Sequence, residues 1–105
     1  MAYDEKRKSK RVAIVLEATW EGQAGHYEAR VSDISRDGCY LDTIGEAALG
    51  DLVQINVRLP NGNWLPLSGV VAHRQQNLGF GITFTNLSEE QRQLINQLID
   101  AATQE

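Results

Sequence analysis

Several residue types that build specialised proteins are scarce in this chain of 105 residues. It has a single cysteine, Cys39, which excludes an internal disulfide and any metal or redox site built on paired cysteines. Its longest apolar run, residues 12–16, is far shorter than the roughly 20 residues that span a bilayer. The first residues are charged and have no apolar segment, so they do not resemble a secretory signal. We therefore expect a cytoplasmic protein that does not associate with membranes.

Positive charge is also scarce, and it is unevenly distributed. The net charge is −4, yet residues 1–11 carry five basic and two acidic groups while residues 12–105 carry five basic and twelve acidic groups. Binding to long DNA needs many cations spread along one face, and single-stranded nucleic acid also needs stacking aromatics on a basic surface. The acidic body and its few aromatic residues argue against both. A basic arm on an acidic domain suits a small, compact anion.

The pattern of apolar residues predicts one mainly β domain. Residues 1–11 have no apolar periodicity and are expected to form a flexible basic arm, with the domain occupying residues 12–105. Alternation with period two, interrupted by Gly-rich and Asn-rich turns, predicts six strands. They are residues 12–20, 26–32, 38–43, 52–59, 64–74 and 78–84, with a two-residue Asn-Gly turn expected at Asn61-Gly62 and Leu67, Val70 and Val71 as the best core candidates of the fifth.

The C-terminal part predicts one amphipathic helix over about residues 88–103. Ser88 and Gln91 have the spacing of a capping box, in which each side chain satisfies the backbone N–H of the other. The apolar residues that follow fall on one stripe: Leu94, Ile95, Leu98, Ile99 and Ala102. Six antiparallel strands with short turns and one terminal helix favour a small closed or nearly closed barrel, because closure removes exposed strand edges.

A polar turn, Asp33-Ile34-Ser35-Arg36-Asp37-Gly38, separates the second and third predicted strands. Asp33 and Ser35 are two residues apart, so in an extended backbone both side chains point to the same side and could hold one object. Gly38 permits a positive φ or the close approach of a ligand. The alternative is an ordinary tight turn with an Asx-type hydrogen bond.

The arm contains two arginines four residues apart, Arg7 and Arg11, which lie on one side of an extended or a helical segment. Guanidinium forms two parallel hydrogen bonds with phosphate or with the O6/N7 edge of guanine, and it stacks on purines. The alternative interpretation of the arm is a solvated basic tail.

Arm and turn together resemble a PilZ domain, a bacterial receptor module for cyclic di-GMP. The RxxxR motif of that family is matched by Arg7 and Arg11, and its (D/N)xSxxG motif by Asp33, Ser35 and Gly38. Residues 79–84 and 87–90 are similar to the closing strand and helix start of the family. The order of the motifs and their separation of about twenty residues make the joint match specific, whereas either motif alone is common.

The resemblance implies a six-stranded PilZ-type barrel in which Arg7 and Arg11 hold phosphates and guanine edges while Asp33, Ser35 and Gly38 surround a guanine. The chemistry agrees for Asp33, because a carboxylate accepts from the N1–H and N2–H₂ pair that adenine lacks. Many relatives have an arginine before RxxxR, where this chain has Lys6, so the ligand could be one nucleotide or a stacked pair. Lys6, Arg36 and Arg74 are additional candidate contacts.

No residue pattern indicates catalysis or a metal. His26 and His73 are far apart with no clustered ligands, and Ser35 has no surrounding nucleophile-elbow pattern. We expect no enzyme activity and no cofactor besides the ligand cyclic di-GMP. The expected function is a receptor, a monomer or weak dimer, whose arm orders on ligand binding and which signals to a separate, unidentified protein. The alternative is a PilZ-like interaction adaptor that binds no nucleotide.

Overall fold

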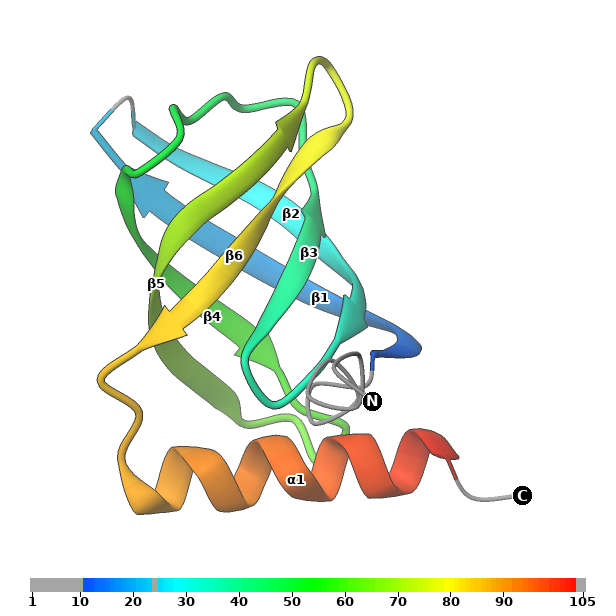
Figure 1. Cartoon of the computed structure of the whole chain (residues 1–105). Coiled ribbons are helices and arrows are strands. Elements are labelled where there is room, and N and C mark those ends of the chain that lie inside the picture. Colours follow the sequence, from blue (N-terminus) through cyan, green and yellow to red (C-terminus); the bar gives the residue numbers. More distant parts are fainter. Residues whose placement is uncertain (1–10, 24, 104–105) are drawn as a thin grey trace, which may run out of the picture.

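The chain folds into an antiparallel β-barrel with one helix across an end of it (Figure 1). The structure is a computed structural model and describes residues 11–23 and 25–103. The six strands close in the order β1-β2-β3-β6-β5-β4, so the predicted closed barrel is confirmed. Their bounds are β1 Val12–Gly22, β2 Gly25–Ile34, β3 Gly38–Asp42, β4 Leu52–Arg58, β5 Trp64–Gln75 and β6 Gly79–Thr85.

The two ends of the barrel carry different connections. Helix α1, Glu89–Thr103, lies at the same end as the β2–β3 turn, whereas the β1–β2 and β5–β6 hairpins lie at the opposite end (Figure 1). β1 pairs with β2 along its length, and both β1–β2 and β2–β3 contain a register shift. Such irregularities bend a strand and let a sheet curve into a small barrel.

Alternating side chains fill the interior, as the period-two pattern predicts. Trp20 is 1 % exposed and lies edge-on to Phe80, with ring centroids 4.9 Å apart. On β5 the prediction is partly wrong, because Leu67 and Val71 are buried but Val70 is only half-buried. Adjacent residues of a strand point to opposite faces, so Val70 and Val71 cannot both face the core. Leu65 and Gly69 take the other inward positions.

The β4–β5 hairpin is longer than the predicted two-residue turn. Leu59 N–H donates to Asn63 O at 2.7 Å, and Gly62 N–H donates to Leu59 O at 2.9 Å. Of Asn61 and Gly62, only Gly62 has a positive φ, 93°. A two-residue turn of type I′ needs positive φ at both central residues, whereas a three-residue loop needs it only at the last. The three residues Pro60, Asn61 and Gly62 therefore form the loop.

Helix α1 begins where the capping box predicts. Ser88 N–H donates to Gln91 Oε1 at 2.7 Å, and Gln91 N–H donates to Ser88 Oγ at 3.0 Å. Gln91 Nε2 also donates to Pro66 O at 2.8 Å, which attaches the helix to β5. Ile95 and Leu98 are buried against the barrel, but Ala102, the last member of the predicted stripe, is exposed. No helix of the described residues is long and apolar enough to cross a membrane.

Candidate functional site

The two motifs of the sequence meet at the start of the barrel. Arg11 Nη1 lies 2.5 Å from Asp33 Oδ1, and the two side chains are 44 % and 33 % exposed. The contact follows from strand pairing, because Val12 at the start of β1 lies opposite Ile34 at the end of β2. The residue before Val12 is therefore level with the β2–β3 turn. We use the name Arg11–Asp33 face for the outer surface of the barrel around Arg11 and Asp33.

Ser35 lies inside the turn rather than beside Asp33 on the outer surface. The side chain of Ser35 is almost fully buried, at 2 % exposed. Its Oγ accepts hydrogen bonds from the N–H groups of Asp37 and Gly38, each at 3.2 Å, and donates to Gly38 O at 3.3 Å. The expectation that Asp33 and Ser35 face the same side assumes an extended backbone, and β2 ends at Ile34, one residue before Ser35. That the two side chains hold one ligand together stays a prediction. The serine hydroxyl caps the turn, in the place expected for an Asx-type bond.

Gly38 is required by packing within the barrel. A Cβ on Gly38 would lie 2.0 Å from the carbonyl oxygen of Ile82, the β6 residue beside it, a distance that no side chain tolerates. Gly38 is not one of the described glycines with a positive φ. The expectation of a positive φ is therefore wrong, and the group that approaches Gly38 is the protein's own backbone. Close approach of a ligand to Gly38 stays a prediction. The turn is further fixed by Phe84 N–H, which donates to Asp37 O at 2.8 Å.

An aromatic surface that sequence reasoning missed lies beside Asp33. Tyr40 is the β3 partner of Asp33, and its ring lies 6.1 Å from the ring of His73 on β5, nearly parallel to it. The hydroxyl of Tyr40 donates to Gln75 Oε1 at 2.7 Å. Between the two strands, β6 contributes only Gly81, where a Cβ would lie 2.6 Å from His73 Nε2. The glycine lets the imidazole reach across β6 toward Tyr40.

The surroundings of Tyr40 raise the pKa of its hydroxyl. Partial burial raises the pKa of Tyr40, and the charges of Asp42 and Asp33 raise it further. Cys39, the neighbour of Tyr40, faces the opposite way and is fully buried. Burial, with a smaller contribution from Asp33, raises the pKa of the Cys39 thiol to about 12, although Arg11 acts to lower it. The thiol stays protonated at neutral pH, so Cys39 is part of the core and not a nucleophile.

The structure separates two predicted arginines from the Arg11–Asp33 face. Arg36 lines two hollows together with Arg92 of α1, and neither Arg11 nor Asp33 lines them. Arg74 lies near the opposite end of the barrel, with its Nη2 4.0 Å from Glu46 Oε1. Lys6 and Arg7 fall outside the described residues.

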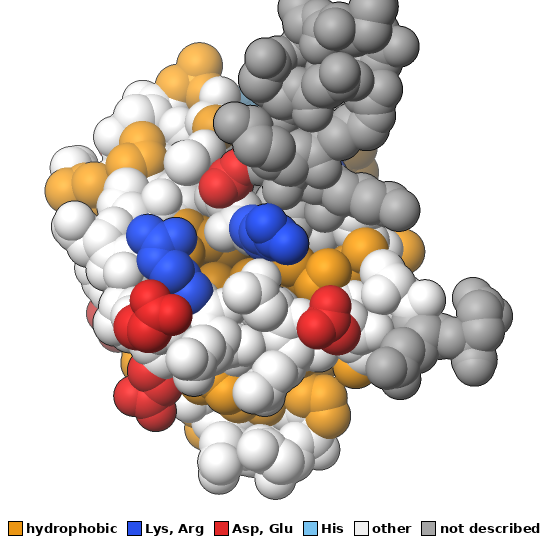
Figure 2. Space-filling model, turned by 60° about the horizontal axis from the view of Figure 1, so that its bottom comes forward, with side chains coloured by type: hydrophobic (Ala, Val, Ile, Leu, Met, Phe, Trp, Pro, Cys, Tyr) orange, Lys and Arg blue, Asp and Glu red, His pale blue; other side chains and the backbone are white. Residues whose placement is uncertain are grey.

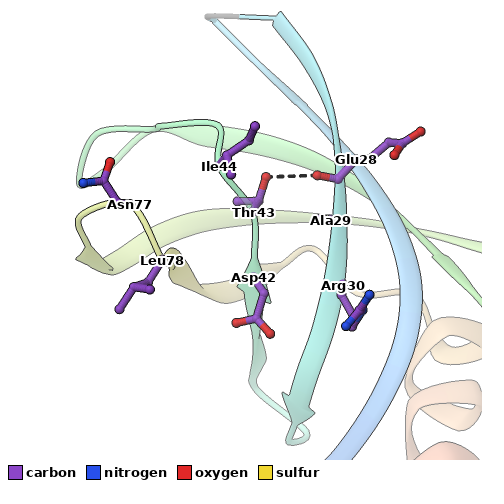
Figure 3. Close-up of a pocket in the computed structure, with 8 residues that line it drawn as sticks. All are labelled: Glu28, Ala29, Arg30, Asp42, Thr43, Ile44, Asn77 and Leu78. Carbon is purple, nitrogen blue, oxygen red and sulfur yellow. Dashed lines mark hydrogen bonds between the residues drawn. The ribbon is translucent and has the colours of Figure 1, made fainter.

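A third hollow, of about 660 Å³, also lies toward that opposite end (Figure 3). The end of β3, the neighbouring part of β2 and the turn at Asn77 and Leu78 line it. Thr43 Oγ1 donates to Glu28 O at 3.0 Å across it, and the side chains of Ile44 and Leu78 are largely exposed beside it. Of the residues predicted to bind ligand, none of those that the structure describes lines this hollow.

Comparison with known proteins identifies the family of this site. The PilZ domain model matches residues 5–101, a range that contains both motifs. The chain belongs to the PilZ domain family. No curated protein matches the chain.

Solved PilZ structures share the fold at low sequence identity. The PilZ domain of YcgR from Escherichia coli, solved with c-di-GMP, has a TM-score of 0.77 at 13 % identity over 92 % of this chain and 91 % of that one. The PilZ domain of CeSA from a cellulose-synthesizing bacterium gives 0.69 at 18 %, over 89 % and 97 %. The inhibitor of motility MotI/DgrA of Bacillus subtilis gives 0.76 at 14 % over 91 % of this chain, which spans about half the length of MotI.

Of the two aromatic residues beside Asp33 that the sequence analysis did not predict, only Tyr40 has a signal in the sequence. Pairing across the β2–β3 turn could have placed Tyr40 beside Asp33, because both flank one turn on strands predicted to be neighbours. His73 has no such signal. Its strand reaches Tyr40 only across β6, and which strands neighbour β3 is decided by closure of the barrel.

Proposed function

We propose that this PilZ domain is a receptor for cyclic di-GMP, not an enzyme, and that it binds the nucleotide on the Arg11–Asp33 face. The observation that carries the proposal is the 2.5 Å contact between Arg11 and Asp33, which brings together one member of each motif from positions 22 residues apart. A guanidinium and a carboxylate side by side on a partly exposed surface match the two polar features of the ligand. One feature is its phosphates, and the other is the donor edge of guanine.

Asp33 selects the base in this proposal. Its carboxylate accepts hydrogen bonds from guanine N1–H and N2–H₂, and adenine lacks this pair of donors. Arg11, together with Arg7 of the arm, then turns to the phosphates and to the O6/N7 edge. Ser35 and Gly38 act indirectly, since they hold the turn that presents Asp33. The rings of Tyr40 and His73 offer an apolar surface on which a purine can stack.

The cost of opening the Arg11–Asp33 ion pair is small compared with the free energy of the hydrogen bonds that replace it. An ion pair this exposed contributes about 0.5 kcal/mol, because water and salt screen it. Each charge-assisted hydrogen bond to the ligand contributes roughly 1.5–3 kcal/mol. The ligand therefore displaces Arg11 from Asp33 at little cost. Arg11 then contacts a phosphate, and Asp33 contacts the donor edge of guanine.

Calorimetric titration with cyclic di-GMP tests the proposal, with cyclic di-AMP and a single-stranded RNA as controls. We expect binding of cyclic di-GMP, a strong preference over cyclic di-AMP and no binding of RNA. Asp33→Ala should weaken binding to cyclic di-GMP more than to cyclic di-AMP. Equal losses for both would remove Asp33 from base selection, and no heat with cyclic di-GMP would favour an adaptor that binds no nucleotide.

The proposal extends to the arm. Residues 4–11 have five basic groups, two acidic groups and no apolar face. Ordering them costs roughly 1–2 kcal/mol of conformational entropy per residue, and contacts with a ligand must offset this cost. Cyclic di-GMP supplies several charged contacts to Arg7 and Arg11 at once, and the ordered arm with the bound nucleotide forms a surface for a separate protein. Hydrogen exchange should show protection of residues 4–11 only with ligand. Equal protection in both states would contradict the switch.

A further inference from the structure

A cleft with two arginines lies between the β2–β3 turn and the first half of α1, and Asp33 is not among the residues that line it. It consists of two adjoining hollows, of about 180 and 420 Å³, and both are lined by Arg36 of the turn and Arg92 of the helix. Figure 2 looks onto this end of the molecule and shows Lys or Arg side chains on either side of a strip of hydrophobic side chains. We call it the Arg36–Arg92 cleft.

The two arginines of the cleft have no counter-charge of their own. Among residues 11–23 and 25–103, the ion pairs of arginine involve Arg11, Arg58 and Arg74, and neither Arg36 nor Arg92. Asp37 is the acidic residue that lines the cleft, and its backbone carbonyl holds the N–H of Phe84. The lining of the two hollows thus has two guanidiniums and one carboxylate, and the nearest acidic residues of α1 are Glu89 and Glu90 in its first turn.

The floor of the cleft contains apolar side chains, next to the polar side chains of Thr83, Asn86 and Asn96. Phe84 and Leu87 line the larger hollow and Ile95 lines the smaller one. Phe84 and Ile95 belong to the barrel and helix core, and Leu87 packs against it half-buried. The cleft therefore combines a hydrophobic floor with two forked donors at its sides, and a guanidinium binds a carboxylate with two parallel hydrogen bonds.

We propose that the Arg36–Arg92 cleft binds a short acidic segment of a partner protein, in which a carboxylate lies next to an apolar side chain. Charge complementarity sets this choice. A long polyanion such as nucleic acid would be repelled by the twelve acidic residues of the domain, while a short segment meets the two arginines and, of the acidic residues that line the cleft, Asp37 alone. A free phosphate would use the arginines but leave the apolar floor uncovered. Binding of the acidic segment does not depend on the proposed nucleotide function, although a role as output surface rests on it.

Hydrogen bonds hold the backbone at both arginines of the cleft. Arg36 lies one residue from Ser35, whose hydroxyl fixes the turn that presents Asp33. Arg92 N–H donates to Ser88 O at 3.0 Å in the capped first turn of α1, so its backbone is held by the helix start. The backbones that carry both guanidiniums are thus fixed before a partner arrives, which lowers the ordering cost of binding.

Backbone NMR of the full chain tests the proposal, using as probe a capped pentapeptide that alternates leucine and glutamate. We expect shifts concentrated at residues 36–37, 84–87 and 92–96, without cyclic di-GMP. A matched peptide with glutamine in place of glutamate should bind about tenfold more weakly, because the charge-assisted bonds are lost. Arg36→Gln and Arg92→Gln should each reduce binding by a similar factor. Arg58→Gln is the control, since Arg58 pairs with Glu17 and lies over Trp64 elsewhere.

Several results would overturn the proposal. One is equal binding of the glutamate and glutamine peptides, and another is binding unchanged by Arg36→Gln and Arg92→Gln together. Shifts confined to residues 6–11 and Asp33 would mean simple attraction to the basic arm. Inorganic phosphate that gives the same shifts at the same concentration as the peptide would show a plain anion site. Because the titration contains no nucleotide, failure here is distinct from failure of cyclic di-GMP binding.

Discussion

The two sides of the β2–β3 turn differ in how their charges are balanced. On the Arg11–Asp33 face a guanidinium and a carboxylate are already in contact, whereas the guanidiniums of the Arg36–Arg92 cleft have no ion-pair partner among the described residues. A ligand of the first site must exchange partners with an existing pair, so it needs both a donor edge and an anion. A ligand of the second needs only an anion beside an apolar group. One six-residue turn thus supports two surfaces with different chemical requirements.

The largest effect is expected at Gly38, because both surfaces depend on the backbone of the β2–β3 turn. Gly38→Ala places a methyl group 2.0 Å from Ile82 O, so β3 and β6 must separate locally. We expect the free energy of unfolding to fall by about 3 kcal/mol, and both surfaces to be lost. Urea denaturation measures this. Gly50→Ala is the control, because a Cβ there has nothing within 4 Å and only the positive φ costs about 1 kcal/mol. Equal losses for the two variants would contradict the packing role of Gly38.

The next effect separates the two sides. Arg11→Ala should weaken cyclic di-GMP binding by about a hundredfold, because two charge-assisted bonds are removed, and Arg11→Lys should restore little of it. Arg92→Gln should leave nucleotide affinity within about twofold, since loss of a distant surface charge is largely screened. Calorimetry of the three variants makes the comparison. If Arg11→Lys binds as well as the parent protein, the forked geometry of arginine is not what the site uses.

A smaller effect is expected from the group that joins the sides. Ser35→Ala leaves the N–H groups of Asp37 and Gly38 without their acceptor inside a buried turn, which costs about 2 kcal/mol of stability. Nucleotide affinity should fall less than in Arg11→Ala, because Asp33 and Arg11 remain. Thermal unfolding and titration of the same sample measure both. A loss of affinity as large as that of Arg11→Ala, with unchanged stability, would mean that Ser35 contacts the ligand directly.

The smallest effect concerns alkylation of the Cys39 thiol, which should be nearly absent in the folded protein. Because burial raises the pKa of Cys39 to about 12, its thiol should resist iodoacetamide near pH 8 in the folded protein and react after unfolding in urea. Arg11 lowers this pKa and Asp33 raises it, so Arg11→Ala should slow the reaction of the native state further. Mass spectrometry of the alkylated peptide measures the rate. Rapid labelling of the native protein would show that the barrel opens locally and exposes Cys39.

Local sequence patterns predict most of the secondary structure. Period-two alternation located all six strands within two residues at nearly every boundary, because a strand with one buried face must alternate. The capping box set the start of α1, since its two hydrogen bonds are made between residues three apart. The two motifs likewise indicated Arg11 and Asp33 as members of one site, by resemblance to a family.

The contacts between these elements depend on the folded barrel. Pairing of β1 with β2 placed Arg11 on Asp33, and the end of β2 turned Ser35 inward to cap the turn. Closure of the barrel brought β6 against Gly38 and β5 within reach of Tyr40. Docking of α1 against the barrel placed Arg92 beside Arg36. Each is a contact between segments far apart in the chain, which local patterns of propensity and spacing do not encode.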